Sequence, residues 1–323
     1  MSRHNRFGSL AVACAMLLAA GGVAAQTVGV AASNPGSLYH STGSALAKLM
    51  SEQAGVPATV QPFASATIYL PAVNAGEYQF GITNEDEARL AVTGAGHFAG
   101  RPGADLRAVS ILYPLRLGFF VRKDSDIKDV SGLKGKRITY GFTSQKTIPP
   151  IIAATLEIAG LSESDIKPVM VPNVVGGANA FIAGKADAFI FALGAAKVAE
   201  ANASAGGIRL LGFGDTAENL AVVRKHFPPA YIKQEAAHAR NIGVTAPTNA
   251  IAYDVLLMSN AQTDEDTVYK VAKAMHGNKK AMAASFGVLN LFQPDRMNKP
   301  LGPIQWHPGA IRFYKETGAW RGE

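Results

Sequence analysis

Short apolar runs alternate with amphipathic segments along the chain and predict strands and helices. An apolar run over 27–32 precedes a polar loop and apolar positions at helical spacing that end at Gly55. A second apolar run, 58–63, leads into a helix ending at Gly76, and a third, 78–83, follows directly. This order predicts a strand–helix–strand–helix–strand unit.

The same unit recurs in the middle of the chain. Its strands and helix ends are expected, in order, at 137–140, Gly160, 168–171, Gly184 and 187–191. The two helix-terminating glycines lie 105 and 108 residues after their counterparts in the first copy. Strands that alternate with helices favour doubly wound α/β lobes with parallel strands. A single nine-strand sheet with accidental internal similarity is the alternative.

Two longer apolar runs, 110–122 and 250–259, are each long enough to cross from one lobe to the other. The chain then leaves the first lobe near 117 and returns near 247. We therefore predict a lobe one formed by 26–117 and 247–323 and a lobe two formed by 118–246. Two crossing strands between lobes make a hinge, with a cleft between the lobes.

The N-terminus carries a separate pattern. Arg3 and Arg6 precede an apolar run over 10–20, and small residues follow where a signal peptidase cleaves. We expect a signal peptide over 1–25, cleaved after Ala25, and a periplasmic mature protein. A membrane anchor is the weaker alternative, because the run is shorter than the roughly 20 residues of a membrane span.

Composition and charge exclude several function classes. The net charge is +7, of which Arg3 and Arg6 supply +2, so the mature chain retains +5. No Lys/Arg run reaches five residues and aromatics do not interleave with the basic residues, so we expect no nucleic-acid partner. The charge implies at most a mild attraction for anionic ligands.

Sequence signals for catalysis, metals and cofactors are lacking. Cys14 is the only cysteine and lies in the expected signal peptide, so the mature chain has no thiol for a disulfide or a metal. Neither a G-x-S-x-G elbow nor an H-E-x-x-H helix occurs. His307 stands alone and fits a capping or packing role better than that of a base. We expect a non-enzymatic protein without cofactor or metal.

Ligands of open α/β sheets bind beyond the carboxyl ends of the strands. Here these are the loops 33–39, 64–67, 142–147 and, more weakly, 174–178. Each opens a helix, whose first N–H groups lack partners and carry partial positive charge, which suits an organic anion. Capping is the competing role for their Ser, Thr and Asn side chains. The expected ligand-binding residues are Ser33, Asn34, Ser37, Leu38, Tyr39, Ser65, Ala66, Thr67, Asn84, Arg116, Thr143, Ser144, Gln145, Lys146 and Thr147.

Two cations among these residues are candidates for pairing with the ligand. Lys146 lies in a helix-opening loop, and Arg116 lies between two leucines on a crossing strand. A cation among apolar neighbours needs an anionic partner. For Lys146 we favour the ligand as the partner and expect Lys146→Ala to weaken binding, whereas for Arg116 a structural Asp or Glu is favoured as the partner.

Other residues near these loops have roles that the sequence leaves open. Asp86 is expected to cap the following helix. Four aromatic residues could either form the wall of the ligand pocket or belong to the hydrophobic core: Tyr39, Phe63, Tyr69 and Tyr113.

Several short motifs, taken in order, resemble one family of receptors. They are Leu38-Tyr39, the segment 43–49, Ala75-Gly76-Glu77, Leu112-Tyr113-Pro114, 129–137, 266–270 and His307-Pro308-Gly309-Ala310. Together they are similar to the TAXI branch of solute receptors for TRAP (tripartite ATP-independent periplasmic) transporters, across essentially the whole mature chain.

The resemblance implies a hinge-bending periplasmic-binding-protein fold, type II-like, that docks to an integral membrane TRAP subunit driven by an ion gradient. It implies small carboxylate ligands such as glutamate or 2-oxoglutarate. An ATP-driven importer or a sensor kinase as partner, a periplasmic enzyme and a pure interaction protein are the alternatives.

Three loops depart from the family pattern. The family usually has Gly-Thr-Gly where this chain has Ala31-Ala32-Ser33, and Gly-Gly-Ser where it has Ala64-Ser65-Ala66. A third loop, which usually contains Ser-Gly-Thr, reads 144–147 Ser-Gln-Lys-Thr. Side chains thus replace glycines that let backbone donors approach a ligand. The fold therefore transfers better than the family's ligands do.

Overall fold

The first repeat forms a three-stranded parallel sheet in the computed structural model, which describes residues 27–322. The strand β1 (Val28–Ser33) pairs with β2 (Ala58–Phe63) on one side and β3 (Phe80–Asn84) on the other. Helices α1 (Leu38–Gln53) and α2 (Ala66–Asn74) connect them. The signal peptide predicted over 1–25 lies outside the described residues.

The second repeat has the same order. The strand β5 (Arg137–Gly141) pairs in parallel with β6 (Lys167–Val171) and with β7 (Ala188–Ala192). Helices α4 (Ile148–Ile158) and α5 (Val174–Ile182) connect these strands. In both repeats the first strand is central, so the predicted duplication is confirmed, although hydrogen bonding joins all the strands into one ten-stranded sheet.

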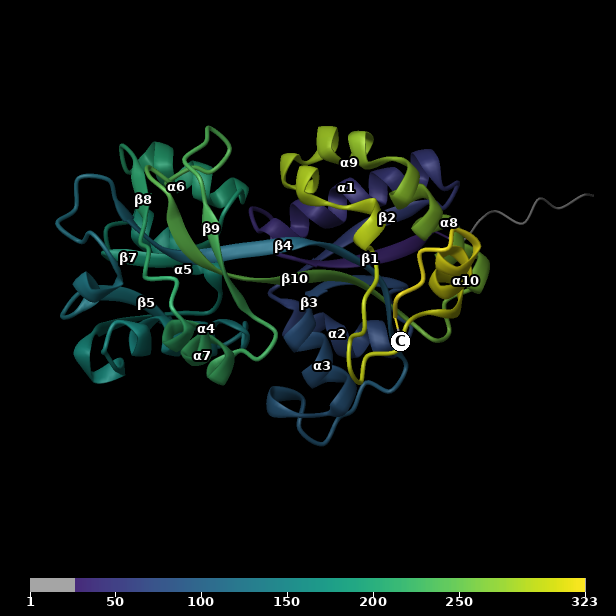
Figure 1. Cartoon of the computed structure of the whole chain (residues 1–323), viewed down its shortest axis with the longest axis horizontal. Coiled ribbons are helices and arrows are strands. Elements are labelled where there is room, and N and C mark those ends of the chain that lie inside the picture. The colour runs from purple at the N-terminus through teal and green to yellow at the C-terminus, as the bar shows by residue number, and fades with distance from the viewer. Residues whose placement is uncertain (1–26, 323) are drawn as a thin grey trace, which may run out of the picture.

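The two long strands β4 (Leu106–Arg122) and β10 (Thr248–Asn260) run between the two repeats (Figure 1). One end of β10 pairs with β3 and the other with β9 (Tyr231–Glu235). The strand β4 pairs with β10 as far as Leu117 and with β7 from Leu117 onward. The two-lobed α/β fold with two crossing strands is therefore confirmed, while the exact lobe boundaries stay a prediction.

Helices cover both faces of each half, as a doubly wound fold requires. In Figure 1, α1 and α9 (Lys279–Ser285) lie above the first half of the sheet and α2 and α3 (Glu85–Thr93) lie below it. The strands β3 and β7 are buried at every position, as parallel strands covered on two faces are. The remaining α-helices and strands of the described chain are α6 (Ala196–Ser204), β8 (Ile208–Leu210), α7 (Ala217–His226), α8 (Glu265–Gly277) and α10 (Pro308–Glu316).

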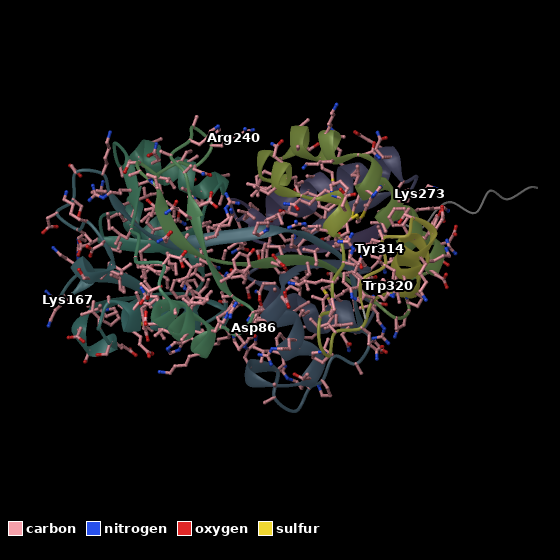
Figure 2. The ribbon with its side chains drawn as sticks, in the orientation of Figure 1. Asp86, Lys167, Arg240, Lys273, Tyr314 and Trp320 are labelled. Carbon is pink, nitrogen blue, oxygen red and sulfur yellow. The ribbon has the colours of Figure 1, made fainter. Side chains whose placement is uncertain are left out.

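The C-terminal segment is anchored by aromatic packing. Tyr314 on α10 stacks on Trp320, and Figure 2 shows the two residues side by side. Both rings meet Trp306 edge-on. The Tyr314 hydroxyl donates a 2.6 Å hydrogen bond to the Val109 carbonyl of β4. His307 caps α10 through its Nδ1, which accepts from the Gly309 N–H, so the expected capping role of this histidine is confirmed.

Candidate ligand-binding site

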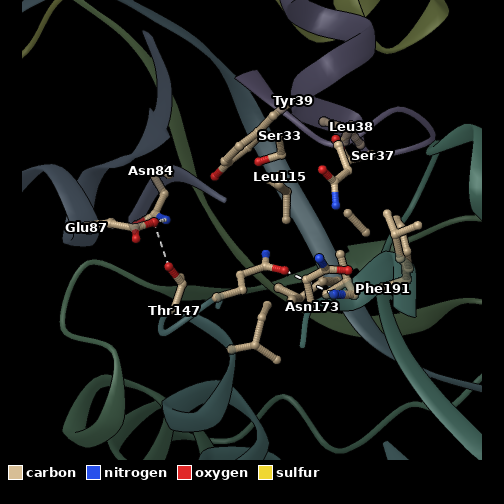
Figure 3. A pocket seen from close by; sticks show the side chains of 18 of the residues that line it. Ser33, Ser37, Leu38, Tyr39, Asn84, Glu87, Leu115, Thr147, Asn173 and Phe191 are labelled. Atoms are coloured by element: carbon tan, nitrogen blue, oxygen red, sulfur yellow. Dashed lines mark hydrogen bonds between the residues drawn. The ribbon is translucent and has the colours of Figure 1, made fainter. Parts of the chain in front are cut away.

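A cavity of about 50 Å³ lies where the carboxyl ends of parallel strands from both repeats meet (Figure 3). A volume of this size suits a compact ligand, since one water molecule needs roughly 10–15 Å³. The lining residues are Ser33, Asn34, Ser37, Leu38, Tyr39, Ala64, Ala66, Asn84, Glu87, Leu115, Leu117, Gln145, Thr147, Ile148, Asn173, Val174, Val175, Phe191, Ala192 and Tyr253.

Several helices begin at this cavity. The side chain of Ser37 caps α1 by accepting from the His40 N–H at 3.1 Å, and that of Asn173 caps α5 by accepting from the Gly176 N–H at 2.9 Å. The helix α4 starts directly after Thr147. Helix N-termini carry partial positive charge, and those of α1, α4 and α5 come from both repeats. Their convergence creates an environment that favours a negatively charged group.

Two side-chain amides add hydrogen-bond donors to the cavity wall. The oxygen of Asn173 is engaged in capping, and the Gln145 Oε1 accepts from the Val174 N–H at 3.1 Å. Because both oxygens are occupied, the amide nitrogens are the groups left for other partners, and neither has one within residues 27–322. Two hydrogen-bond donors are thus available to an acceptor in the cavity.

Two tyrosines contribute neutral hydroxyl groups to the wall. Burial raises the pKa of Tyr39 and of Tyr253 well above the ordinary value for tyrosine. Both phenols are therefore protonated at physiological pH. Each can donate a hydrogen bond to a ligand oxygen.

One carboxylate, Glu87 on α3, also faces the cavity, and it is only 2% exposed. It accepts hydrogen bonds from the Thr67 hydroxyl at 2.5 Å and from the Thr147 hydroxyl at 2.6 Å. The Asn84 amide lies 3.4 Å from its Oε2, and His97 Nε2 lies 3.5 Å from its Oε1. Thr147 belongs to the second repeat, so this carboxylate links the two halves of the protein (Figure 3).

Further hydrogen bonds cross between the halves beside the cavity. They join the Ser65 hydroxyl to the Ser144 carbonyl, the Lys146 N–H to the Thr67 hydroxyl, and the Lys197 N–H to the Gly36 carbonyl. Such bonds form only when the two halves are close together. In this structure the two repeats are therefore in direct contact beside the cavity, and residues of both line it.

The structure brings most of the sequence-predicted residues to one place. Those that line the cavity are Ser33, Asn34, Ser37, Leu38, Tyr39, Ala66, Asn84, Gln145 and Thr147. Those that lie outside its lining are Ser65, Thr67, Arg116, Thr143, Ser144 and Lys146. Of the latter, four take part in the contacts between the halves described above, namely Ser65, Thr67, Ser144 and, through its backbone N–H, Lys146.

Arg116 lies on the far side of its strand from the cavity. Successive side chains of a strand point to opposite faces, and its neighbours Leu115 and Leu117 line the cavity. The Arg116 guanidinium instead meets the Glu235 carboxylate, with Nε and Oε1 3.1 Å apart, and is only 4% exposed. The structural partner that the sequence left open is therefore Glu235.

Lys146 is exposed, as is Thr143. The structure engages Lys146 through its backbone N–H, with its side chain outside the cavity lining. Of the aromatics open to either role, Tyr39 lines the cavity while Tyr69 and Tyr113 are fully buried in the core. Asp86 does not cap α3, because Asn84 does so and Asp86 forms an ion pair with Arg89.

Glu87, Asn173 and Tyr253 are polar lining residues that the sequence analysis missed. Glu87 stands three residues after Asn84, the usual position of a carboxylate in the first turn of a capped helix, and this spacing was an available signal. Asn173 lies two residues after the strand predicted at 168–171. Tyr253 lies on a long apolar strand, where no local pattern shows which face meets the cavity.

Within the described part of the chain, no helix is long and apolar enough to cross a membrane. Residues 27–322 also contain no group of three or more His, Asp or Glu side chains arranged to hold a metal ion.

Comparison with known proteins agrees with this architecture. A structure described as a periplasmic transporter superposes with a TM-score of 0.59 at 15% identity, covering 80% of this chain and 85% of that one. MatC from Rhodopseudomonas palustris with bound malate gives 0.55 at 14% identity, covering 91% and 97%. PhnD1 from Prochlorococcus marinus in complex with methylphosphonate gives 0.52 at 11% identity, covering 91% and 99%.

These likenesses establish the fold of a two-lobed periplasmic binding protein. The sequence match is more direct, since the model of one family covers residues 30–318, nearly the whole described chain. The protein belongs to the NMT1-like family.

Proposed function

We propose that the protein is a non-enzymatic periplasmic receptor that binds a small organic anion, namely a carboxylate or an amino or keto acid, in the cavity. The observation that carries this proposal is the convergence of the α1, α4 and α5 N-termini, from both repeats, on one cavity. Two proteins of similar fold hold the anions malate and methylphosphonate, which supports an anionic ligand.

Hydrogen-bond donors, and not cations, would hold the anion. Within residues 27–322 no Lys or Arg lines the cavity, whereas Gln145, Asn173, Tyr39 and Tyr253 present neutral donors. A single carboxylate group can be satisfied by such donors and by helix N-termini.

Delivery to the membrane subunit of a TRAP transporter is the second part of the proposal. It rests on the TAXI-like motifs spread along the sequence. Export by the segment 1–25 and a hinge between a lobe one of 26–117 plus 247–323 and a lobe two of 118–246 belong to the same proposal. Co-purification of a TRAP membrane subunit with the receptor is the expected result, and co-purification of an ATP-driven importer would contradict this part alone.

Ligand binding is expected to raise the melting temperature of the mature protein. A ligand at 100 times its Kd adds about 2.7 kcal/mol to the free energy of unfolding, which shifts the melting temperature by several degrees. The measurement is a thermal-shift series on ligand-stripped protein from residue 26 onward with monocarboxylates, dicarboxylates, keto acids and amino acids. Folded protein with no shift in the whole series would contradict a carboxylate receptor.

Replacing Asn173 by aspartate is expected to weaken binding by about ten- to a hundredfold. The aspartate oxygen keeps the cap of α5, but a carboxylate replaces the amide donor, and hydrogen bonds to charged groups are worth about 1.5–3 kcal/mol. Isothermal titration with the ligand found by thermal shift measures the change. Lys146→Ala is the control and should leave Kd within about twofold, since this side chain lies outside the cavity lining. The opposite ranking of these two variants would reverse the assignment.

A further inference from the structure

We propose that Glu87 is a specificity-determining residue, which makes the site reject ligands with a second negative group and accept those whose far end is an amide, a hydroxyl or an ammonium. The proposal rests on the proposed function, since it divides the small organic acids named there into two classes. Among residues 27–322, Glu87 is the one acidic side chain that lines the cavity.

The hydrogen bonds around Glu87 indicate that its carboxyl group is ionised. The Thr67 hydroxyl accepts from the Lys146 N–H, so its own proton points to Glu87. The Asn84 oxygen accepts from the Glu87 N–H, which turns the amide NH₂ toward Oε2. The Thr147 hydroxyl donates to the same oxygen. Three donors around an acceptor-only group are the surroundings of a carboxylate and not of a carboxylic acid.

The position of Glu87 in the chain also favours the ionised form. It lies in the first turn of α3, where the unpaired N–H groups of the helix favour a negative charge. Its burial keeps bulk water from screening that charge toward the cavity. The negative potential therefore reaches any ligand held in the cavity.

The cavity has two chemically different sides. Figure 3 shows Glu87 and Asn84 on the side away from Asn173 and Phe191. The helix N-termini of α1 and α5 and the amide donors lie on the Asn173 side, where one carboxylate of the ligand would bind. The remainder of such a ligand would then extend toward Glu87.

No fixed cation balances Glu87 from within the cavity lining in the described part of the chain. His97 Nε2, 3.5 Å from Oε1, is the nearest group able to carry a positive charge, and it lies outside that lining. Two negative groups about 5 Å apart at an effective dielectric constant near 20 repel each other enough to lower affinity on the order of a hundredfold. A ligand end that donates a hydrogen bond avoids this repulsion.

Matched ligands test the inference directly. Three sets have chains of three to five carbons and differ at one end only: malonate, malonamate and β-alanine; succinate, succinamate and 4-aminobutyrate; glutarate, glutaramate and 5-aminopentanoate. Titration calorimetry at pH 8, where imidazoles are largely neutral, measures each Kd. We expect the best member to be an amide or an amine and its dicarboxylate to bind about a hundredfold more weakly.

Glu87→Gln should reduce that preference to within about fivefold. The variant also weakens the contact between the halves, so the Kd of every ligand changes. The ratio of the dicarboxylate Kd to the amide Kd within one set is insensitive to that common change. Asp86→Asn is the control, since it removes one charge from the same helical turn outside the cavity lining and should keep the wild-type ratio.

The outcomes separate the two proposals. A dicarboxylate that binds wild-type protein as tightly as its amide, or a ratio unchanged by Glu87→Gln, overturns the role of Glu87 while the receptor stands. Folded protein that binds no member of any set and no acid in the thermal-shift series overturns the receptor for organic acids and this inference with it.

Discussion

Replacing Glu235 by glutamine is expected to lower the free energy of unfolding by about 3–5 kcal/mol. Glu235 and Arg116 are 7% and 4% exposed. The Arg116 Nε and the Glu235 Oε1 lie 3.1 Å apart, on the face of the crossing strands opposite the cavity. Glutamine keeps the size of the side chain but leaves the guanidinium buried without its counter-charge. Lys233 also lies near Glu235, but it is a more exposed cation and cannot replace the lost negative charge. Thermal unfolding followed by circular dichroism should show a melting temperature lower by roughly 10 °C.

A double variant separates the buried charge from the loss of packing. Arg116→Met combined with Glu235→Leu removes both charges, and replacing a buried ion pair by apolar residues of similar volume is often neutral or stabilising. The double variant should therefore be clearly more stable than Glu235→Gln. If Glu235→Gln unfolds at the wild-type temperature, the pair is hydrated in solution and the argument from its burial is wrong.

Replacing Gly309 by alanine is expected to destabilise the protein by about 3 kcal/mol, near the upper end of the range for overpacking. This glycine lies in the first turn of α10, where the helix packs against α8. A Cβ atom there would overlap with the Glu265 carbonyl oxygen and would lie 2.9 Å from the Tyr269 nitrogen. Both obstacles are backbone atoms, so a side-chain rotation cannot relieve the overlap. Chemical denaturation with urea measures the loss.

Gly277→Ala is the matched control for this effect. Gly277 is the last residue of α8, and a Cβ atom there meets nothing within 4 Å. Alanine also has the higher helix propensity, so this variant should be as stable as wild type or slightly more so. Equal stability of the two alanine variants would mean that α10 is free to move away from α8. It would also remove the structural reason for a glycine in the His307-Pro308-Gly309-Ala310 motif.

Local pattern was sufficient for the repeated unit and the crossing strands. The strand β2 has the bounds predicted from sequence, and Pro149 and Pro150 fall in the first turn of α4, where their missing N–H groups remove no helical hydrogen bond. These features are written in neighbouring residues: apolar runs, prolines at helix starts and glycines at helix ends. The carboxyl-end rule predicts that the helix-opening loops of both repeats lie around one cleft, and residues of these loops line the cavity.

The direction of individual side chains was beyond the sequence. On β4 the cavity is lined by Leu115 and Leu117, and a shift of one residue would have exchanged them for Arg116. The sequence predicts Lys146 as a ligand contact, because a cation in a helix-opening loop suits an anion, whereas the structure places its side chain outside the cavity lining. Its side chain is nevertheless exposed, since the loop is engaged through backbone groups.

The sequence by itself determined the two α/β repeats, the two crossing strands and the loops that form the cavity, because each depends on residues close together in the chain. The tertiary structure alone decided which side chains enter the cavity and that Glu87 is held by Thr147 from the other repeat. The hydrogen bond between Glu87 and Thr147 joins residues 60 positions apart. The directions of the side chains depend on strand register, and this bond depends on how the two halves meet. No local pattern of apolar and polar residues specifies either one.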